Sequence, residues 1–104
     1  MFGFTFGDIT ITRIVEIEMP MLGATTFFPD WDEGAIDPHR YWMVPRRYDP
    51  VSGNVVINIQ AFLIRTPRHT ILVDTCVGNH KPRNRDLFDN AKVPWMDNFL
   101  KLGV

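Results

Sequence analysis

Apolar and polar residues alternate along Ile9–Glu18, and this alternation predicts a half-buried β-strand. Isoleucine and valine occupy one side of the pattern, and Thr10, Thr12, Glu16 and Glu18 occupy the other. Arg13 and Ile14 interrupt the alternation, as a bulge or a local twist would. We therefore expect a strand with its buried side on Ile9, Ile11, Val15 and Ile17.

A second and a third strand follow later in the chain. Val55–Thr66 begins with polar residues on one face and becomes apolar on both faces, after turn signals in Tyr48–Asn54. Thr66–His69 is a short turn containing Pro67, and the unbroken apolar run Ile71–Val73 is typical of a strand covered on both faces. The pattern predicts an antiparallel hairpin that enters a covered sheet.

The last predicted element is a helix over residues 94–103. Pro94 stands at a first-turn position and Gly103 follows the last apolar residue of the helical pattern, as is usual at the two ends of a helix. Trp95, Phe99 and Leu102 lie on one side. One helix with one apolar side, together with three strands, is too little to cover a sheet on both faces, so the elements predict an α+β fold that is incomplete within residues 1–104.

Residues 19–53 contain several prolines and show no sustained period, which predicts one long loop. The segment is rich in aromatic residues, which disordered linkers lack, so we expect it to pack over a surface or a pocket. Its aromatic side chains are Phe27, Phe28, Trp31, Tyr41, Trp42 and Tyr48.

Composition and charge exclude some classes of partner. The formal net charge is −1, so no overall positive field attracts nucleic acid or an anionic membrane. The sequence has no signal-peptide pattern and no apolar run of membrane-spanning length, and its single cysteine, Cys76, cannot form an internal disulfide. We expect a soluble, cytoplasmic chain without nucleic-acid or membrane partners.

The stretch HTILVDTCVGN, His69–Asn79, carries the candidate chemistry. Asp74 directly follows the apolar run, and its carboxylate would either form the turn through local hydrogen bonds or meet a cation or a metal-site histidine. Cys76 has no nucleophile signature around it. His39, His69 and His80 have no metal-ligand spacing, so a complete zinc site within the chain is not expected. His80, Lys81, Arg83 and Arg85 form a basic patch that would hold an anionic group or simply be solvated.

The region Gly53–Asn84, with ILVDTCVGN at its centre, resembles the metallo-β-lactamase superfamily, in which a hairpin strand ends in an Asp-Thr turn and a glycine follows. Many relatives have glycine at the position of Cys76. FTFGDITITRIVE at the start and the helix near the end resemble the same N-terminal half. Within the superfamily the chain is most similar to lactonase-like hydrolases of the quorum-quenching type.

The resemblance implies the N-terminal half of a single αββα sandwich domain, whose complete form hydrolyses a lactone, ester or similar small molecule with one or two zinc ions. The family's ligand motif, H-x-H-x-D-H, is absent from residues 1–104, so this chain alone is expected to bind no zinc and to be inactive. Asp74 would support the metal site from beside its ligands. Phe27, Phe28, Trp31, Tyr41, Trp42 and His80 would line the substrate rim, and homo-oligomers are compatible with this hypothesis.

Two other functions remain open from the sequence. The chain could be a complete small β-rich binding module whose aromatic segment binds a partner. It could also be a cysteine enzyme that uses Cys76, with His69 or His80 as the base.

Overall fold

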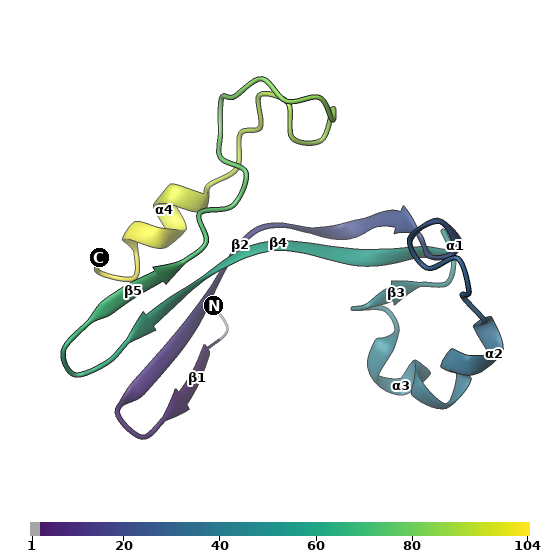
Figure 1. The fold of residues 1–104 in the computed structure, drawn as a ribbon, viewed down its shortest axis with the longest axis horizontal. Helices are drawn as coiled ribbons and strands as arrows, with labels where there is room; N and C mark the ends of the chain where they lie inside the picture. The colour runs from purple at the N-terminus through teal and green to yellow at the C-terminus, as the bar shows by residue number, and fades with distance from the viewer. Residues whose placement is uncertain (1–2) are drawn as a thin grey trace. The chain divides into compact units, whose positions relative to one another are not determined.

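The computed structural model describes residues 3–104, in which five strands and several short helices give an α+β fold. The strands are β1 (Gly3–Phe6), β2 (Ile9–Gly23), β3 (Tyr48–Asp49), β4 (Asn54–Arg65) and β5 (Thr70–Val73). Their order in the sheet is β1-β2-β4-β3, and β5 also pairs with β4 (Figure 1). The three predicted strands and the hairpin are confirmed, whereas β1 and β3 were not predicted.

The chain divides into two compact units. We name Met1–Ile17 with Ile59–Val104 the hairpin unit, and Glu18–Asn58 the aromatic unit. The long strands β2 and β4 each contribute to both units.

In the hairpin unit, two antiparallel hairpins form the sheet. β1 pairs with β2, with Phe6 opposite Ile9, and β4 pairs with β5, with Leu63 opposite Leu72. The turn between β4 and β5 is closed by the Thr66 hydroxyl, which accepts hydrogen bonds from the backbone N–H of Arg68 (3.2 Å) and His69 (2.9 Å). The predicted Thr66–His69 turn is thus confirmed, and its closure explains why a proline is tolerated there.

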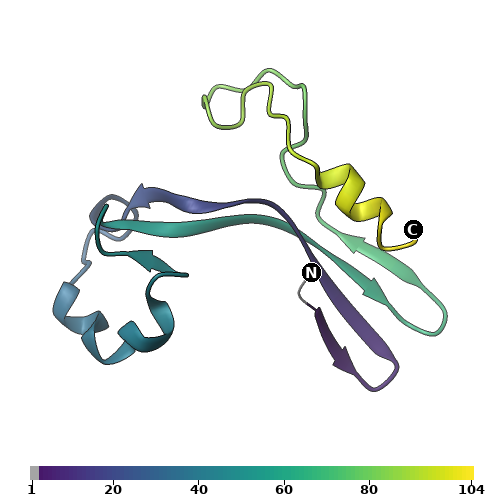
Figure 2. The same cartoon turned by 180° about the vertical axis from the view of Figure 1, so that it is seen from behind.

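Helix α4 (Trp95–Leu100) lies alongside β5 in both views of the ribbon (Figures 1 and 2). Gly103 adopts a φ of +77° after the helix, the left-handed conformation that commonly ends a helix and that glycine adopts without strain. The rings of Trp95 and Phe99, one turn apart, stack with centroids 5.2 Å apart. The predicted helix is confirmed.

One face of the hairpin-unit sheet is covered and contains its core. Ile14, Ala61 and Leu63 are at most 1% exposed, and the partner of Leu63, Leu72, lines a cavity together with the α4 side chains Trp95 and Phe99. The prediction of which side of β2 is buried was wrong. The buried residues of this strand are Ile14 and Glu16, and they lie on the side where polar, exposed residues were expected.

The opposite face, which we call the open face, stays exposed within residues 3–104. Cross-strand pairs place Phe62 beside Val73 and Ile64 beside Ile71, and Ile71 and Val73 are 44% and 45% exposed. The expectation that β5 is covered on both faces is therefore wrong for the described chain. Phe4 and Phe6 pair with isoleucines on the β2 side opposite Glu16, so they extend the open face.

The aromatic unit replaces the single long loop predicted for residues 19–53. Its helical segments are α1 (Ala24–Phe27), α2 (Glu33–Ile36), the 3₁₀ turn η1 (Asp37–His39) and α3 (Arg40–Met43). A small core forms around four buried residues, Ala24, Ile36, Tyr48 and Val55. No single element is longer than four residues between Ala24 and Met43, so no helical period was visible in the sequence.

The β3–β4 turn confirms the turn signals in Tyr48–Asn54. The Asp49 carboxylate accepts hydrogen bonds from the Val51 backbone N–H (3.0 Å) and the Ser52 hydroxyl (2.6 Å), and Gly53 has a φ of +73°. The two hydrogen bonds hold the carboxylate charged, and they lower the pKa of Asp49.

Replacing Gly53 tests how far this turn depends on the left-handed backbone. A Cβ added at Gly53 would meet nothing within 4 Å, so the Gly53→Ala variant suffers only conformational strain, about 1–2 kcal/mol. We expect a corresponding loss in the free energy of unfolding measured by urea titration. Gly53→Asn is the matched control and should lose less, because asparagine tolerates this conformation; equal losses in both variants would contradict the explanation.

Candidate functional site at the end of strand β5

Asp74 ends β5 in a tight turn of left-handed backbone. Its φ is +70°, that of Cys76 is +61°, and the Asp74 Oδ1 atom accepts a hydrogen bond from the Cys76 backbone N–H at 2.7 Å. Aspartate is among the few non-glycine residues that adopt such a φ, because its short carboxylate can satisfy the local backbone. The exposed Asp74 is therefore a turn-forming residue, which is one of the two roles that its position predicted.

Glu16 fixes the chain just beyond this turn. Its carboxylate reaches from β2 and accepts hydrogen bonds from the backbone N–H groups of Val77 (3.1 Å) and Gly78 (3.0 Å). Glu16 is only 8% exposed, and a buried carboxylate is tolerated when donors satisfy it in this way. The two bonds join residues more than 60 positions apart, so the turn after β5 has a fixed position on the sheet.

The segment from Asn79 to Val93 forms a closed loop. The Asn79 side chain accepts a hydrogen bond from the Val93 N–H (3.0 Å) and donates one to the Val93 carbonyl (2.6 Å). Backbone bonds from His80 to Ala91 and from Asn90 to Lys81 continue the closure. Such loops with joined ends are compact without regular secondary structure.

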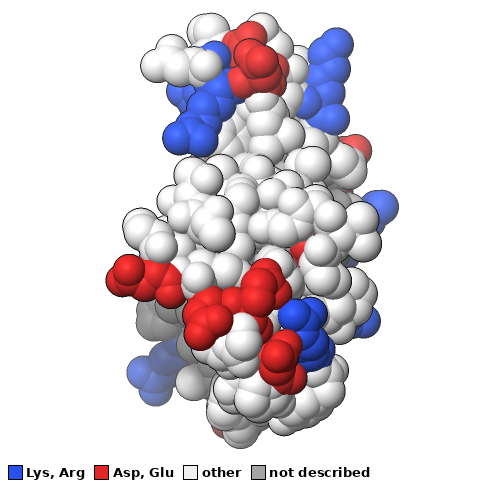
Figure 3. All heavy atoms as spheres, turned by 90° about the vertical axis from the view of Figure 1, so that its right-hand side faces the viewer, with Lys and Arg blue, Asp and Glu red and all other residues white. Residues whose placement is uncertain are grey.

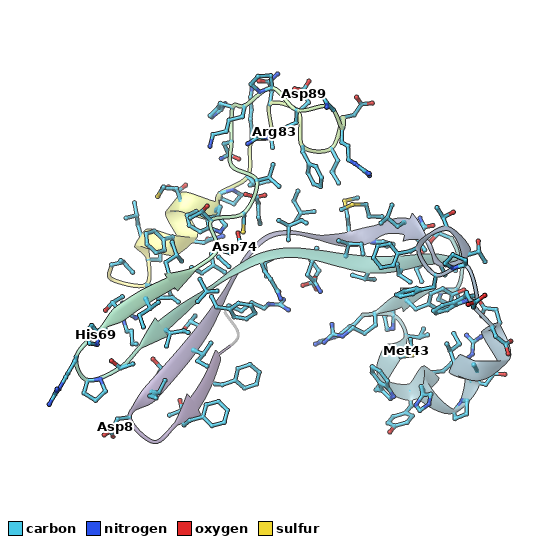
Figure 4. All side chains as sticks on the ribbon, in the orientation of Figure 1. Asp8, Met43, His69, Asp74, Arg83 and Asp89 are labelled. Carbon is cyan, nitrogen blue, oxygen red and sulfur yellow. The ribbon has the colours of Figure 1, made fainter. Side chains whose placement is uncertain are left out.

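The basic patch predicted on this loop is partly used in holding the loop together. The Arg83 guanidinium donates to the Val77 carbonyl (3.1 Å), and the Arg83 backbone N–H donates to the Asp89 carboxylate (2.9 Å). Figure 4 shows Arg83 and Asp89 on the loop, away from the strands. Arg83 thus has a structural role, and Lys81 and Arg85 are exposed.

A cavity of about 410 Å³ lies between the turn and α4. Its wall includes Glu16, Leu72, Cys76, Lys81 and Trp95. The Trp95 indole nitrogen is buried and finds no hydrogen-bond partner among the described residues. The cavity is a mixed surface of apolar rings and few polar groups, as small-molecule sites commonly are.

The thiol of Cys76 has a raised pKa beside this turn. Burial, reinforced by the negative charges of Glu16 and Asp74, raises the pKa of the Cys76 thiol to about 11, while the nearby Trp95 indole acts weakly in the opposite direction. A thiol with a raised pKa holds little thiolate at neutral pH, and the thiolate is the nucleophile. The raised pKa thus counts against the cysteine-enzyme hypothesis.

The histidines do not gather at this site. His69 lies at the tip of the β4–β5 hairpin, at the opposite end of β5 from Asp74 (Figure 4). His80 is exposed at the start of the closed loop, and His39 belongs to the aromatic unit, where it accepts a hydrogen bond from the Trp42 indole (3.3 Å). Within residues 3–104, no three histidine, cysteine, aspartate or glutamate side chains come together as a metal site would require.

The residues proposed as a substrate rim belong to two units. His80 lies in the hairpin unit with Asp74, and the five aromatic residues lie in the aromatic unit. Among the latter, Phe28 packs against both Phe27 and Trp31, with ring centroids 4.8 and 6.1 Å away. Tyr41 and Trp42 are 87% and 52% exposed.

The comparisons with known proteins give no match: neither a family model, nor a curated protein, nor a solved structure is similar to this chain at a significant level. Among the helices of residues 3–104, none has the length and apolar character needed to cross a membrane.

Removing the Glu16 carboxylate tests its anchoring role. In Glu16→Ala the Val77 and Gly78 N–H groups lose their acceptors, and each such loss costs about 1–3 kcal/mol. We expect hydrogen exchange at these two amides to accelerate at least tenfold. The Val93 amide, bonded to Asn79, serves as an internal reference, and unchanged exchange at Val77 and Gly78 would contradict the assignment.

Alkylation kinetics test the state of Cys76. With a pKa raised from about 9 to about 11, the thiolate population near pH 8 falls by about 100-fold, so iodoacetamide should react about 100-fold more slowly than with the urea-unfolded chain. The rate in the folded chain should keep rising up to pH 11. A midpoint near pH 9 in the rate profile of the folded chain would show that the thiol is unperturbed.

Proposed function

We propose that this chain is the N-terminal part of a zinc-dependent hydrolase of the metallo-β-lactamase superfamily, and that it acts on a lactone, an ester or a similar small molecule. In this proposal the chain supplies one sheet of an αββα sandwich with α4 on its outer face. The observation that most supports this proposal is the end of the β4–β5 hairpin. There an exposed aspartate closes a turn, and Glu16 fixes the residues that follow.

The open face supports the sandwich part of the proposal. Phe62, Ile64, Ile71 and Val73 form a contiguous apolar surface on β4 and β5, opposite the face that α4 covers. A second sheet packed on the first would bury these side chains at about 25 cal/mol for each Å² of apolar area. An isolated chain with this face exposed is expected to self-associate.

Within residues 3–104, the side chains around Asp74 do not form a zinc site by themselves, because no three histidine, cysteine, aspartate or glutamate side chains come together there. The proposal therefore assigns the metal ligands to residues outside residues 1–104, and it gives Asp74 the role of a positioning residue.

A binding module is the second candidate function. Its supporting observation is that the aromatic unit has its own core, while Phe27, Phe28, Tyr41 and Trp42 are about half exposed or more. Exposed aromatic side chains grouped on a structured surface are typical of interaction sites.

The sequence that follows Val104 in the gene provides the first test. We expect it to encode H-x-H-x-D-H within a few tens of residues, and a coding sequence that continues without this motif would refute the hydrolase proposal. The second measurement uses the protein produced with that continuation. We expect Asp74→Ala to reduce zinc affinity or turnover by about 10–100-fold, as the loss of a residue supporting metal ligands does.

Asp74→Asn is the matched control because an amide oxygen can still accept from the Cys76 N–H and keep the turn. If the carboxylate charge acts on the metal site, Asp74→Asn should lose zinc affinity as Asp74→Ala does. If Asp74→Asn behaves as the wild type while Asp74→Ala is impaired, Asp74 is only a turn-former and its positioning role is refuted.

A further inference from the structure

The cavity between the turn after β5 and α4 has two polar side chains that are already occupied within the chain. Both carboxylate oxygens of Glu16 accept hydrogen bonds, from the Val77 and Gly78 N–H groups. The side-chain amide of Asn79 is bonded twice to the backbone of Val93. Glu16 and Asn79 line the cavity. They fix its wall, so a ligand must be recognised by the other residues of the wall.

Lys81 is a charged residue of the same wall, and its ammonium has no hydrogen bond or ion pair within residues 3–104. The side chain lies back along Gly78. A Cβ placed on Gly78 would stand 3.0 Å from the Lys81 Nζ atom and 3.4 Å from its Cε atom. Because Gly78 also lines the cavity, its missing side chain leaves room for the ammonium at the wall.

The closed loop adds to the positive charge near the cavity. Residues 79–93 include four basic and two acidic residues. Figure 3 shows basic side chains gathered on this loop, at the top of the view. The field of such a loop attracts an anion towards the cavity and repels a cation.

The rest of the wall is largely apolar, with the stacked rings of Trp95 and Phe99 facing Leu72 across the cavity. The Trp95 indole N–H is buried and has no acceptor within residues 3–104. Burying a donor without an acceptor is unfavourable, and a pure hydrocarbon in the cavity would leave this cost in place. A ligand that carries oxygen acceptors on an apolar body is therefore favoured.

We propose that this cavity binds a small organic acid, a carboxylate carried on an apolar body. The body would lie against Leu72 and the rings of Trp95 and Phe99, and the carboxylate would meet the Lys81 ammonium. The cavity lies on the face that α4 covers, so a second sheet on the open face would leave it free. Asp74 is not part of its wall, so the proposal does not depend on the hydrolase proposal.

The test compares phenylacetate with its uncharged analogue, 2-phenylacetamide, on the 104-residue chain. Binding is followed by the NMR signal of the Trp95 indole N–H, which Trp95→Phe identifies. We expect phenylacetate to bind saturably in the millimolar range, as about ten non-hydrogen atoms allow. The amide should bind about fivefold more weakly, because it forms no ion pair with Lys81. Lys81→Gln should remove this difference by weakening phenylacetate binding alone.

Lys101→Gln is the matched control, because Lys101 is an exposed lysine of the same unit and the substitution changes the net charge by the same amount. It should leave phenylacetate binding unchanged. The proposal is overturned if the acid and the amide bind equally, if neither shifts the Trp95 signal saturably, or if Lys101→Gln weakens binding as much as Lys81→Gln does. Lys81 is exposed and its side chain makes no hydrogen bond within residues 3–104, so the Lys81→Gln variant is expected to fold.

Discussion

The carboxylate of Glu16 holds the turn after β5 in place, and the candidate site depends on this contact. Two charge-assisted hydrogen bonds, each worth about 1.5–3 kcal/mol, connect the middle of β2 to the Val77 and Gly78 amides. The bonds position the Asp74 turn at one end and the closed loop from Asn79 to Val93 at the other. Burial is the main cause of the raised pKa of the Cys76 thiol, and the negative charge of the same carboxylate raises it further.

The aromatic unit depends on a comparable contact at Glu33. Its carboxylate accepts hydrogen bonds from the Trp31 indole, the Arg40 guanidinium and the Tyr48 hydroxyl. These donors, the Tyr48 hydroxyl above all, lower the pKa of Glu33, and the same hydrogen bond raises the pKa of Tyr48. Glu33 thereby joins α2, α3 and β3, which are each too short to be stable alone.

Local patterns in the sequence were sufficient to predict the elements whose residues interact with near neighbours. The β4–β5 hairpin, the Tyr48–Asn54 turn and the Trp95 helix have turn residues, alternation or end signals within a few positions. The role of Glu16 could not be predicted, because its donors lie about 60 residues away and backbone N–H groups have no sequence signature. The only sign of this role in the sequence was a carboxylate within a strand of apolar residues. A polar face exposed to solvent would explain that carboxylate equally well. The short helices of the aromatic unit could not be predicted for a related reason. They are stabilised by contacts of Glu33 and Tyr48, and they are too short to show a helical period in the sequence.

The two faces of β5 explain why the sequence and the described chain differ there. Leu72 points to the face that α4 covers, whereas Ile71 and Val73 point to the open face, where no described residue covers them. A strand that is buried on both faces typically consists of consecutive apolar residues without alternation. Ile71–Val73 is such a run. Residues 3–104 therefore cover one face of β5, and in the sandwich that we propose a second sheet would cover the other.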